Sequence, residues 1–125
     1  MTKEMLVAIF NEIGNANFEI TTDIATGHGI NGVSFKTYVA EQKWSEKERY
    51  GDRVWDYYNK INSIEIHDGY VCIETSRDAN YNEWDNGMRR EYVPLDRIVK
   101  VTKLCLIRPS RGEFIRKVST KIIVK

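Results

Sequence analysis

Between residues 63 and 76, a cysteine, a histidine and the carboxylates of Glu65 and Glu74 alternate in a pattern that could support thiol chemistry. Glu65, His67 and Cys72 fall on one face of a β-hairpin if the chain turns at residues 68 and 69. A Cys–His pair that is oriented by a carboxylate can act as a thiol nucleophile. In this register, however, His67 faces Tyr70 rather than Cys72, and neither residue begins a helix that would activate the thiol. We therefore predict no catalytic residue and no enzyme activity.

A second pattern is the segment TGHGING, in which Gly27, Gly29 and Gly32 match G-x-G-x-x-G. In dinucleotide-binding units these glycines let backbone N–H groups approach a pyrophosphate at the start of a helix. Here the next residues, GVSFKTYV, alternate like a strand, and the chain is too short for a doubly wound sheet. We predict a glycine-rich loop between strands, with a mobile loop that carries His28 over a site as the alternative.

The polar segment RDANYNEWDNGMRR, residues 77–90, places aromatic side chains among charges. Segments of this length without an element of their own are more often functional than simple connections. Tryptophan, tyrosine and arginine are the residues that most often anchor protein interfaces. The sequence therefore predicts a partner-binding site at Tyr81, Trp84, Asp85, Arg89 and Arg90.

Charge is distributed unevenly along the chain. Residues 97–125 contain nine Lys or Arg and one acid, a net charge of +8, whereas residues 1–96 contain ten bases and seventeen acids, a net charge of −7. The basic end either neutralises the acidic part or meets a polyanion. For the second case, the sequence predicts a polyanion-binding surface at Lys103, Arg108, Arg111, Arg116 and Lys117.

Length and composition favour a single domain over residues 1–125. Of the 125 residues, 42% are hydrophobic and 30% are charged, which is enough for a packed core. No apolar run approaches the length of a membrane span, and residues 1–15 do not resemble a signal peptide. Cys72 and Cys105 are then expected to be reduced thiols in a cytoplasmic protein. The sequence has no P-loop, H-E-x-x-H, nucleophile elbow or Cys/His metal spacing, so we predict no cofactor and no metal.

The best-defined element is the hairpin that turns at Asp68-Gly69. Asp-Gly suits a two-residue type I′ turn, because both central residues need a positive φ. The predicted register pairs residue 66 with 71 and residue 64 with 73. One face of the hairpin then carries four aliphatic residues and is expected to be buried: Ile64, Ile66, Val71 and Ile73.

Two segments have the pattern of amphipathic helices. Residues 2–13 repeat apolar side chains at helical spacing, with Thr2 as a cap and Gly14 at the end. Residues 44–61 begin with a capping box at Ser45-x-x-Glu48 and predict a second, longer helix, although Gly51 could break it. Its aromatic residues are expected to pack in the core and at its rim, or to form an interface.

The C-terminal third predicts strands at residues 91–93, 97–107 and 114–124, with a β-bulge near residue 102 and a basic hairpin that turns near Arg111-Gly112. The fold class is therefore α+β: an antiparallel sheet of about five to seven strands, with both helices packed on one face.

These features favour a small, non-enzymatic cytoplasmic binding protein that modulates a protein partner. Inhibitors of host defence systems that phages and mobile elements encode are often chains of this kind. The alternative is a module that binds nucleic acid or a nucleotide signal through the basic C-terminal hairpin. No membrane partner is expected, and the sequence leaves a homodimer open.

Overall fold

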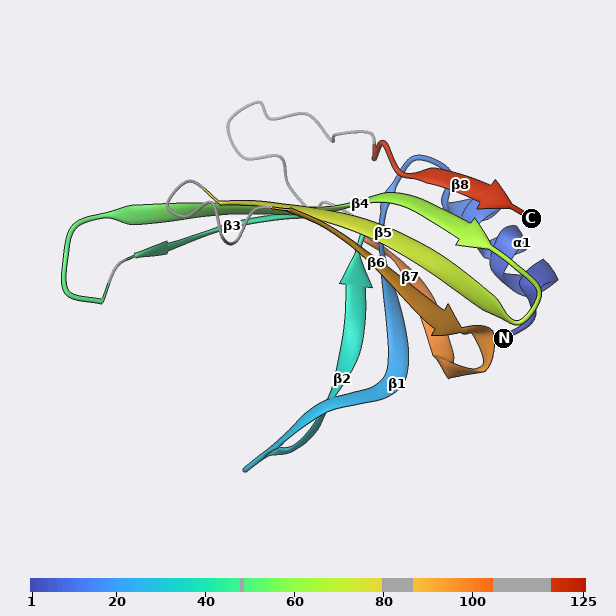
Figure 1. The fold of residues 1–125 in the computed structure, drawn as a ribbon, viewed down its shortest axis with the longest axis horizontal. Coiled ribbons are helices and arrows are strands. Elements are labelled where there is room, and N and C mark those ends of the chain that lie inside the picture. The colour runs from blue at the N-terminus through green and yellow to red at the C-terminus, as the bar shows by residue number, and fades with distance from the viewer. Residues whose placement is uncertain (48, 80–86, 105–117) are drawn as a thin grey trace.

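The computed structural model describes residues 1–47, 49–79, 87–104 and 118–125. Within these residues the chain forms one helix, α1 (Lys3–Ile13), and a 3₁₀ turn, η2 (Leu95–Arg97). The strands are β1 (Asn17–Gly29), β2 (Gly32–Val39), β3 (Glu41–Lys47), β4 (Val54–Ile66), β5 (Tyr70–Ala79), β6 (Gly87–Pro94), β7 (Ile98–Leu104) and β8 (Lys121–Val124). The molecule is thus mostly antiparallel β-sheet with an N-terminal helix (Figure 1).

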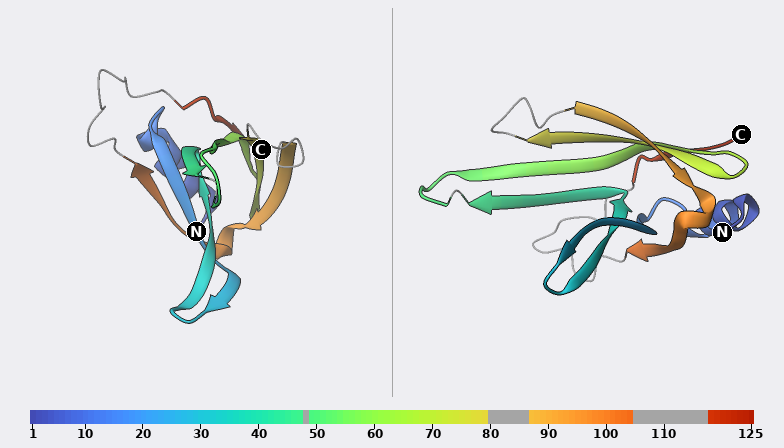
Figure 2. Two further views of the ribbon diagram at one scale, coloured as in Figure 1. Left: turned by 90° about the vertical axis from the view of Figure 1, so that its left-hand side faces the viewer. Right: turned by 60° about the horizontal axis from the view of Figure 1, so that its bottom comes forward.

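The strands form two sheets that share a core. One sheet has the order β2-β1-β7 and the other β3-β4-β5-β6, with β8 parallel to β4. Only Ala40 separates β2 from β3, so the chain passes directly from one sheet to the other, and η2 makes the return passage from β6 to β7. Away from α1, the β1–β2 and β3–β4 hairpins diverge (Figures 1 and 2).

The predicted N-terminal helix is confirmed with its caps. The Thr2 hydroxyl accepts a hydrogen bond from the Met5 N–H at 3.2 Å. Gly14 ends the helix with φ of 64°, which favours glycine, and its N–H donates to the Phe10 carbonyl. Leu6, Phe10 and Ile13 are buried, and the ring of Phe10 lies edge-on to that of Phe18 in β1. The apolar stripe of α1 therefore packs into the core.

The hairpin at Asp68-Gly69 is confirmed residue by residue. Residue 66 pairs with 71 and residue 64 with 73, and the His67 N–H donates to the Tyr70 carbonyl at 2.9 Å. Gly69 has φ of 89°, as the turn requires. All four aliphatic side chains of the predicted buried face are 0% exposed: Ile64, Ile66, Val71 and Ile73.

The predicted second helix is wrong, because residues 44–61 belong to β3 and β4. These strands pair from Glu41 opposite Lys60 to Lys47 opposite Val54. Ser45 does not cap a helix; its hydroxyl donates to the Asp56 carboxylate across the hairpin at 2.6 Å. Aromatic and β-branched residues favour strands when neighbouring strands can pack against them, and β4 has β5 on its other side. Tertiary pairing therefore overrides the helical spacing.

The C-terminal strands also differ from the prediction. β7 pairs with β1 and β8 pairs with β4, so the described parts of these strands lie in different sheets and not in one hairpin. The register of β7 is regular around residue 102. It shifts instead between Lys100 and Ile98, which leaves Val99 as the bulged residue, 58% exposed. This bulge lets Ile98 enter the core while Val101 still faces it.

Candidate functional site

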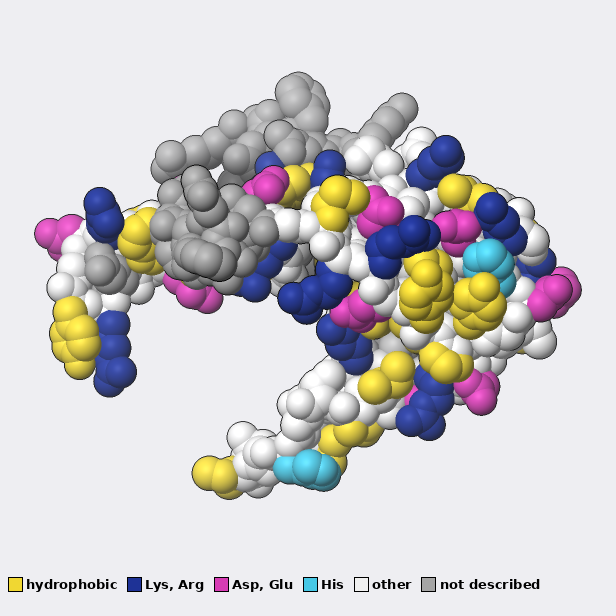
Figure 3. Space-filling model, in the orientation of Figure 1, with side chains coloured by type: hydrophobic (Ala, Val, Ile, Leu, Met, Phe, Trp, Pro, Cys, Tyr) yellow, Lys and Arg dark blue, Asp and Glu magenta, His cyan; other side chains and the backbone are white. Residues whose placement is uncertain are grey.

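A cleft of about 400 Å³ opens where the two sheets diverge, between β2 on one side and β4, β5 and β6 on the other. Figure 3 shows it as the hollow between the two projecting hairpins, with Lys and Arg side chains gathered along its wall. The side chains used in the following argument are Lys36, Tyr38, Asn59, Arg77, Arg89 and Glu91.

Strand register explains why charged residues line this cleft. Residues directly opposite each other in an antiparallel pair share a face of the sheet. Arg77 lies opposite Asn59, Arg89 opposite Thr75, and Glu91 opposite Ile73. Because Ile73 is completely buried, this face is the one that packs in the core. The same face therefore changes from apolar to basic where it extends beyond the cover of the other sheet.

One acidic residue of the cleft is already paired. The Glu91 carboxylate lies 3.3 Å from Lys36 Nζ and accepts a hydrogen bond from the Tyr38 hydroxyl. Burial raises the pKa of the Tyr38 phenol above its ordinary value, and the hydrogen bond and negative charge of Glu91 raise that pKa further. This group links β2 to β6 and holds the two walls of the cleft together.

Two arginines of the cleft have no such partner. Arg77 and Arg89 are both exposed, and no carboxylate in the described parts of the chain forms an ion pair with either. Arginine presents a planar fork of N–H donors that matches a phosphate or a carboxylate. The cleft therefore has two guanidinium groups available for an anion from outside the described chain.

An aromatic pair supports one of these arginines. The rings of Trp44 and Tyr57, which are opposite each other on β3 and β4, stack at 5.0 Å with an angle of 8°. The guanidinium carbon of Arg77 lies 5.4 Å from the Tyr57 ring centre and 5.9 Å from that of Trp44. Contact with π faces orients a guanidinium while its N–H donors, which lie in its plane, can still bind an anion.

Asn59 adds an unsatisfied acceptor to the cleft lining. Its Oδ1 atom is buried and has no hydrogen-bond donor within the described structure. Leaving such an oxygen unsatisfied costs about 1–3 kcal/mol. Asn59 lies opposite Arg77 on the same face, so this unsatisfied oxygen belongs to the wall of the cleft that carries the arginine.

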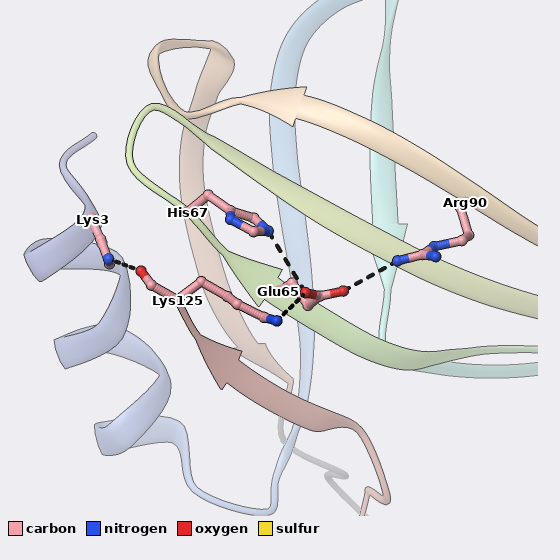
Figure 4. A network of polar contacts seen from close by, with 5 residues as sticks. All are labelled: Lys3, Glu65, His67, Arg90 and Lys125. Carbon is pink, nitrogen blue, oxygen red and sulfur yellow. Dashed lines mark hydrogen bonds and ion pairs between the residues drawn. The ribbon is translucent and has the colours of Figure 1, made fainter.

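The opposite face of β4 and β5 contains a separate polar cluster around Glu65 (Figure 4). Its carboxylate lies 3.1 Å from Arg90 Nη2, 3.6 Å from Lys125 Nζ and 3.7 Å from His67 Nε2. These contacts connect β4 with β6 and with the C-terminal residue. Cys72, opposite Glu65, is only 3% exposed, so its thiol is closed to a substrate.

The structure separates residues that the sequence grouped together. Arg89 and Arg90 are neighbours in β6 and therefore lie on opposite faces, with only Arg89 in the cleft. Lys103 lies on β7 in the other sheet, opposite Phe18. The remaining predicted site residues lie outside the described residues: Tyr81, Trp84, Asp85, Arg108, Arg111, Arg116 and Lys117.

Sequence reasoning missed Lys36, Arg77 and the stacked Trp44–Tyr57 pair. With residues 44–61 read as a helix, these aromatics do not oppose each other, and Arg77 has no aromatic neighbour. Gly51-Asp52, which lies in the connection between β3 and β4, is the signal that could have revealed the hairpin.

The glycine-rich segment forms the end of the β1–β2 hairpin, where His28 pairs with Val33. In the described residues, no group of three or more His, Cys, Asp or Glu side chains could hold a metal. Among the same residues, the helices lack the length and apolar character of a membrane span. Comparisons of the chain with protein-family models, curated proteins and solved structures found no match.

Proposed function

We propose that the chain binds single-stranded nucleic acid in the cleft between the two hairpins. The observation that carries the proposal is the pair of exposed guanidinium groups, Arg77 and Arg89, which have no carboxylate partner among the described residues. Guanidinium–phosphate contacts provide affinity for a nucleic-acid backbone. The sequence alternative assigns nucleic-acid or nucleotide-signal binding to the basic C-terminal hairpin, whereas this proposal assigns it to Arg77 and Arg89 in the cleft.

The shape of the cleft favours a single strand over a duplex. It has a volume of about 400 Å³ and is open between the hairpins (Figure 3), so a flexible strand can enter and leave it. Proteins that bind single strands combine a basic groove with aromatic side chains for base stacking. Trp44 stacks on Tyr57 and lies half-buried beside Arg77 at the border of the cleft, and we assign base stacking to this side chain.

Cytoplasmic binding is part of the proposal. Cys72 is a free thiol, which agrees with a reducing compartment. The proposed function is binding without catalysis, because binding alone accounts for the arrangement of the cleft residues.

The test is fluorescence polarisation with labelled oligonucleotides. The double variant Arg77→Gln/Arg89→Gln should lose roughly tenfold or more in affinity, since a hydrogen bond to a charged group contributes about 1.5–3 kcal/mol. The matched control is Lys100→Gln/Lys121→Gln, which removes the same charge from exposed positions on β7 and β8.

Equal binding by the two double variants would refute the cleft as the site. Binding of a duplex in preference to a single strand would refute the choice of ligand. If free mononucleotides bind as tightly as oligonucleotides, the ligand of the cleft is a nucleotide signal and not a single strand.

A specific surface favours the second candidate, a protein partner whose activity this chain modulates. The β1–β2 hairpin projects from the molecule, and its apolar side chains Ile30, Val33 and Phe35 are 105%, 42% and 50% exposed. Exposed apolar groups of this kind mark interaction surfaces. Ile30→Ser/Phe35→Ser should abolish co-purification of such a partner, and an unchanged yield would exclude this hairpin.

A further inference from the structure

Among the described strands, β6 is the outermost of its sheet, and its outer edge has no partner there. It pairs with β5 on one side, and its described pairs include no strand on the other (Figure 2). Met88 and Tyr92 on this strand are 69% and 66% exposed. An open edge with apolar side chains is a template for pairing with another strand.

The hydrogen bonds of β6 show which backbone groups face this edge. The Leu95 N–H donates to the Gly69 carbonyl at 2.9 Å, and β5 and β6 remain in regular register from Tyr70 opposite Pro94 to Arg77 opposite Gly87. In an antiparallel pair, every second residue exchanges hydrogen bonds with the neighbouring strand. The odd-numbered residues of β6 therefore bond to β5, and the N–H and C=O groups of Met88, Arg90 and Tyr92 point outward.

We propose that two copies of the chain pair through β6 in an antiparallel dimer, with Arg90 opposite Arg90 of the second copy. This register uses the outward backbone groups of Met88, Arg90 and Tyr92. Met88 then faces Tyr92 of the second copy, and Tyr92 faces Met88 of the second copy. It also sets Arg89 opposite Glu91 of the second copy on the cleft face, twice, while each Glu91 keeps its contact with Lys36 of its own chain. The dimer therefore leaves Arg77 as the guanidinium of each cleft that has no carboxylate partner among the described residues. A two-fold axis makes such an interface self-complementary.

The pairing of Arg90 with Arg90 of the second copy brings two like charges together, but it does not oppose this arrangement. Each Arg90 already lies 3.1 Å from Glu65 of its own chain, so the pair of like charges at the axis is compensated. The alternative registers are worse: a shift of two residues places Arg89 opposite Arg89 or Glu91 opposite Glu91, without the compensation from Glu65.

The register can be tested by disulfide trapping. Met88→Cys/Tyr92→Cys should give a cross-linked dimer on mild oxidation, because directly opposite residues have Cα atoms about 5.5 Å apart, within disulfide reach. Each single variant should cross-link far less, since two copies of one position are offset by four residues, or about 13 Å. The wild-type chain, with Cys72 and Cys105, controls for background.

Sedimentation provides the second measurement. Wild type should have the mass of a dimer at high micromolar concentration, and Met88→Pro should be a monomer with unchanged circular dichroism, because Pro removes an N–H that points outward. Met88→Thr keeps that N–H and should remain dimeric. A monomeric wild type, single cysteine variants that cross-link as well as the double one, or assemblies larger than a dimer would each overturn the proposal.

Discussion

The salt dependence of oligonucleotide binding tests the cleft more stringently than affinity alone. Each phosphate that a cation neutralises on a single strand contributes about −0.7 to the slope of log affinity against log salt. Lys36 is already paired with Glu91, so at protein concentrations low enough to keep the chain monomeric the expected value is set by Arg77 and Arg89, which have no carboxylate partner among the described residues. The predicted slope is about −1.4 for the wild type and about −0.7 for Arg77→Gln.

A fourfold rise in salt should therefore weaken binding about sevenfold in the wild type but only about threefold in Arg77→Gln. Fluorescence polarisation across a salt series measures both slopes on the same oligonucleotide. Lys100→Gln, on the exposed part of β7, should keep the wild-type slope. If Arg77→Gln kept that slope while Lys100→Gln lost it, the phosphate contacts would lie outside the cleft and the reasoning would fail.

Three further predictions concern the framework of the site. Ile73→Ala should lower the free energy of unfolding by about 2–5 kcal/mol in urea titrations, because this completely buried side chain leaves a cavity. Glu65→Gln should lower the urea denaturation midpoint slightly, since the carboxylate that contacts the partly exposed Arg90 guanidinium loses its charge; an unchanged midpoint would show that the cluster is not stabilising. Burial and Glu91 raise the pKa of Tyr38 in the folded state, so the stability that this phenol contributes is complete below its ordinary pKa of about 10 and declines as pH rises above it. Tyr38→Phe should remove this decline from a urea series that extends to alkaline pH, and an identical decline in the variant would assign it to another group.

Local signals were sufficient for α1 and for the β4–β5 hairpin. Thr2 and Gly14 act within a turn of the helix that they cap, and the Asp68-Gly69 turn fixes the pairing of the residues on either side. The burial of Ile64 and Ile73 follows from the alternation of side chains along the strands. Nothing distant in the chain has to be known for these elements.

The cleft could not be predicted in the same way. Arg77, Arg89 and Lys36 come from three strands, and only the pairing of β5 with β4 and β6, together with the passage at Ala40, brings them to one cleft. The sequence placed its candidate sites in residues 81–90 and 103–117, and among the described residues of these two segments Arg89 lines the cleft whereas Arg90 and Lys103 do not.

The amino-acid sequence by itself determined the capped N-terminal helix, the aspartate–glycine turn and the aliphatic face of the central hairpin, because each depends on residues within a few positions of one another. Only the tertiary structure decided that residues 44–61 extend as strands, that β7 and β8 join different sheets, and that a basic wall forms beyond the core. The physical reason is that strand formation depends on the neighbours available for pairing and packing, and those neighbours are distant in the chain.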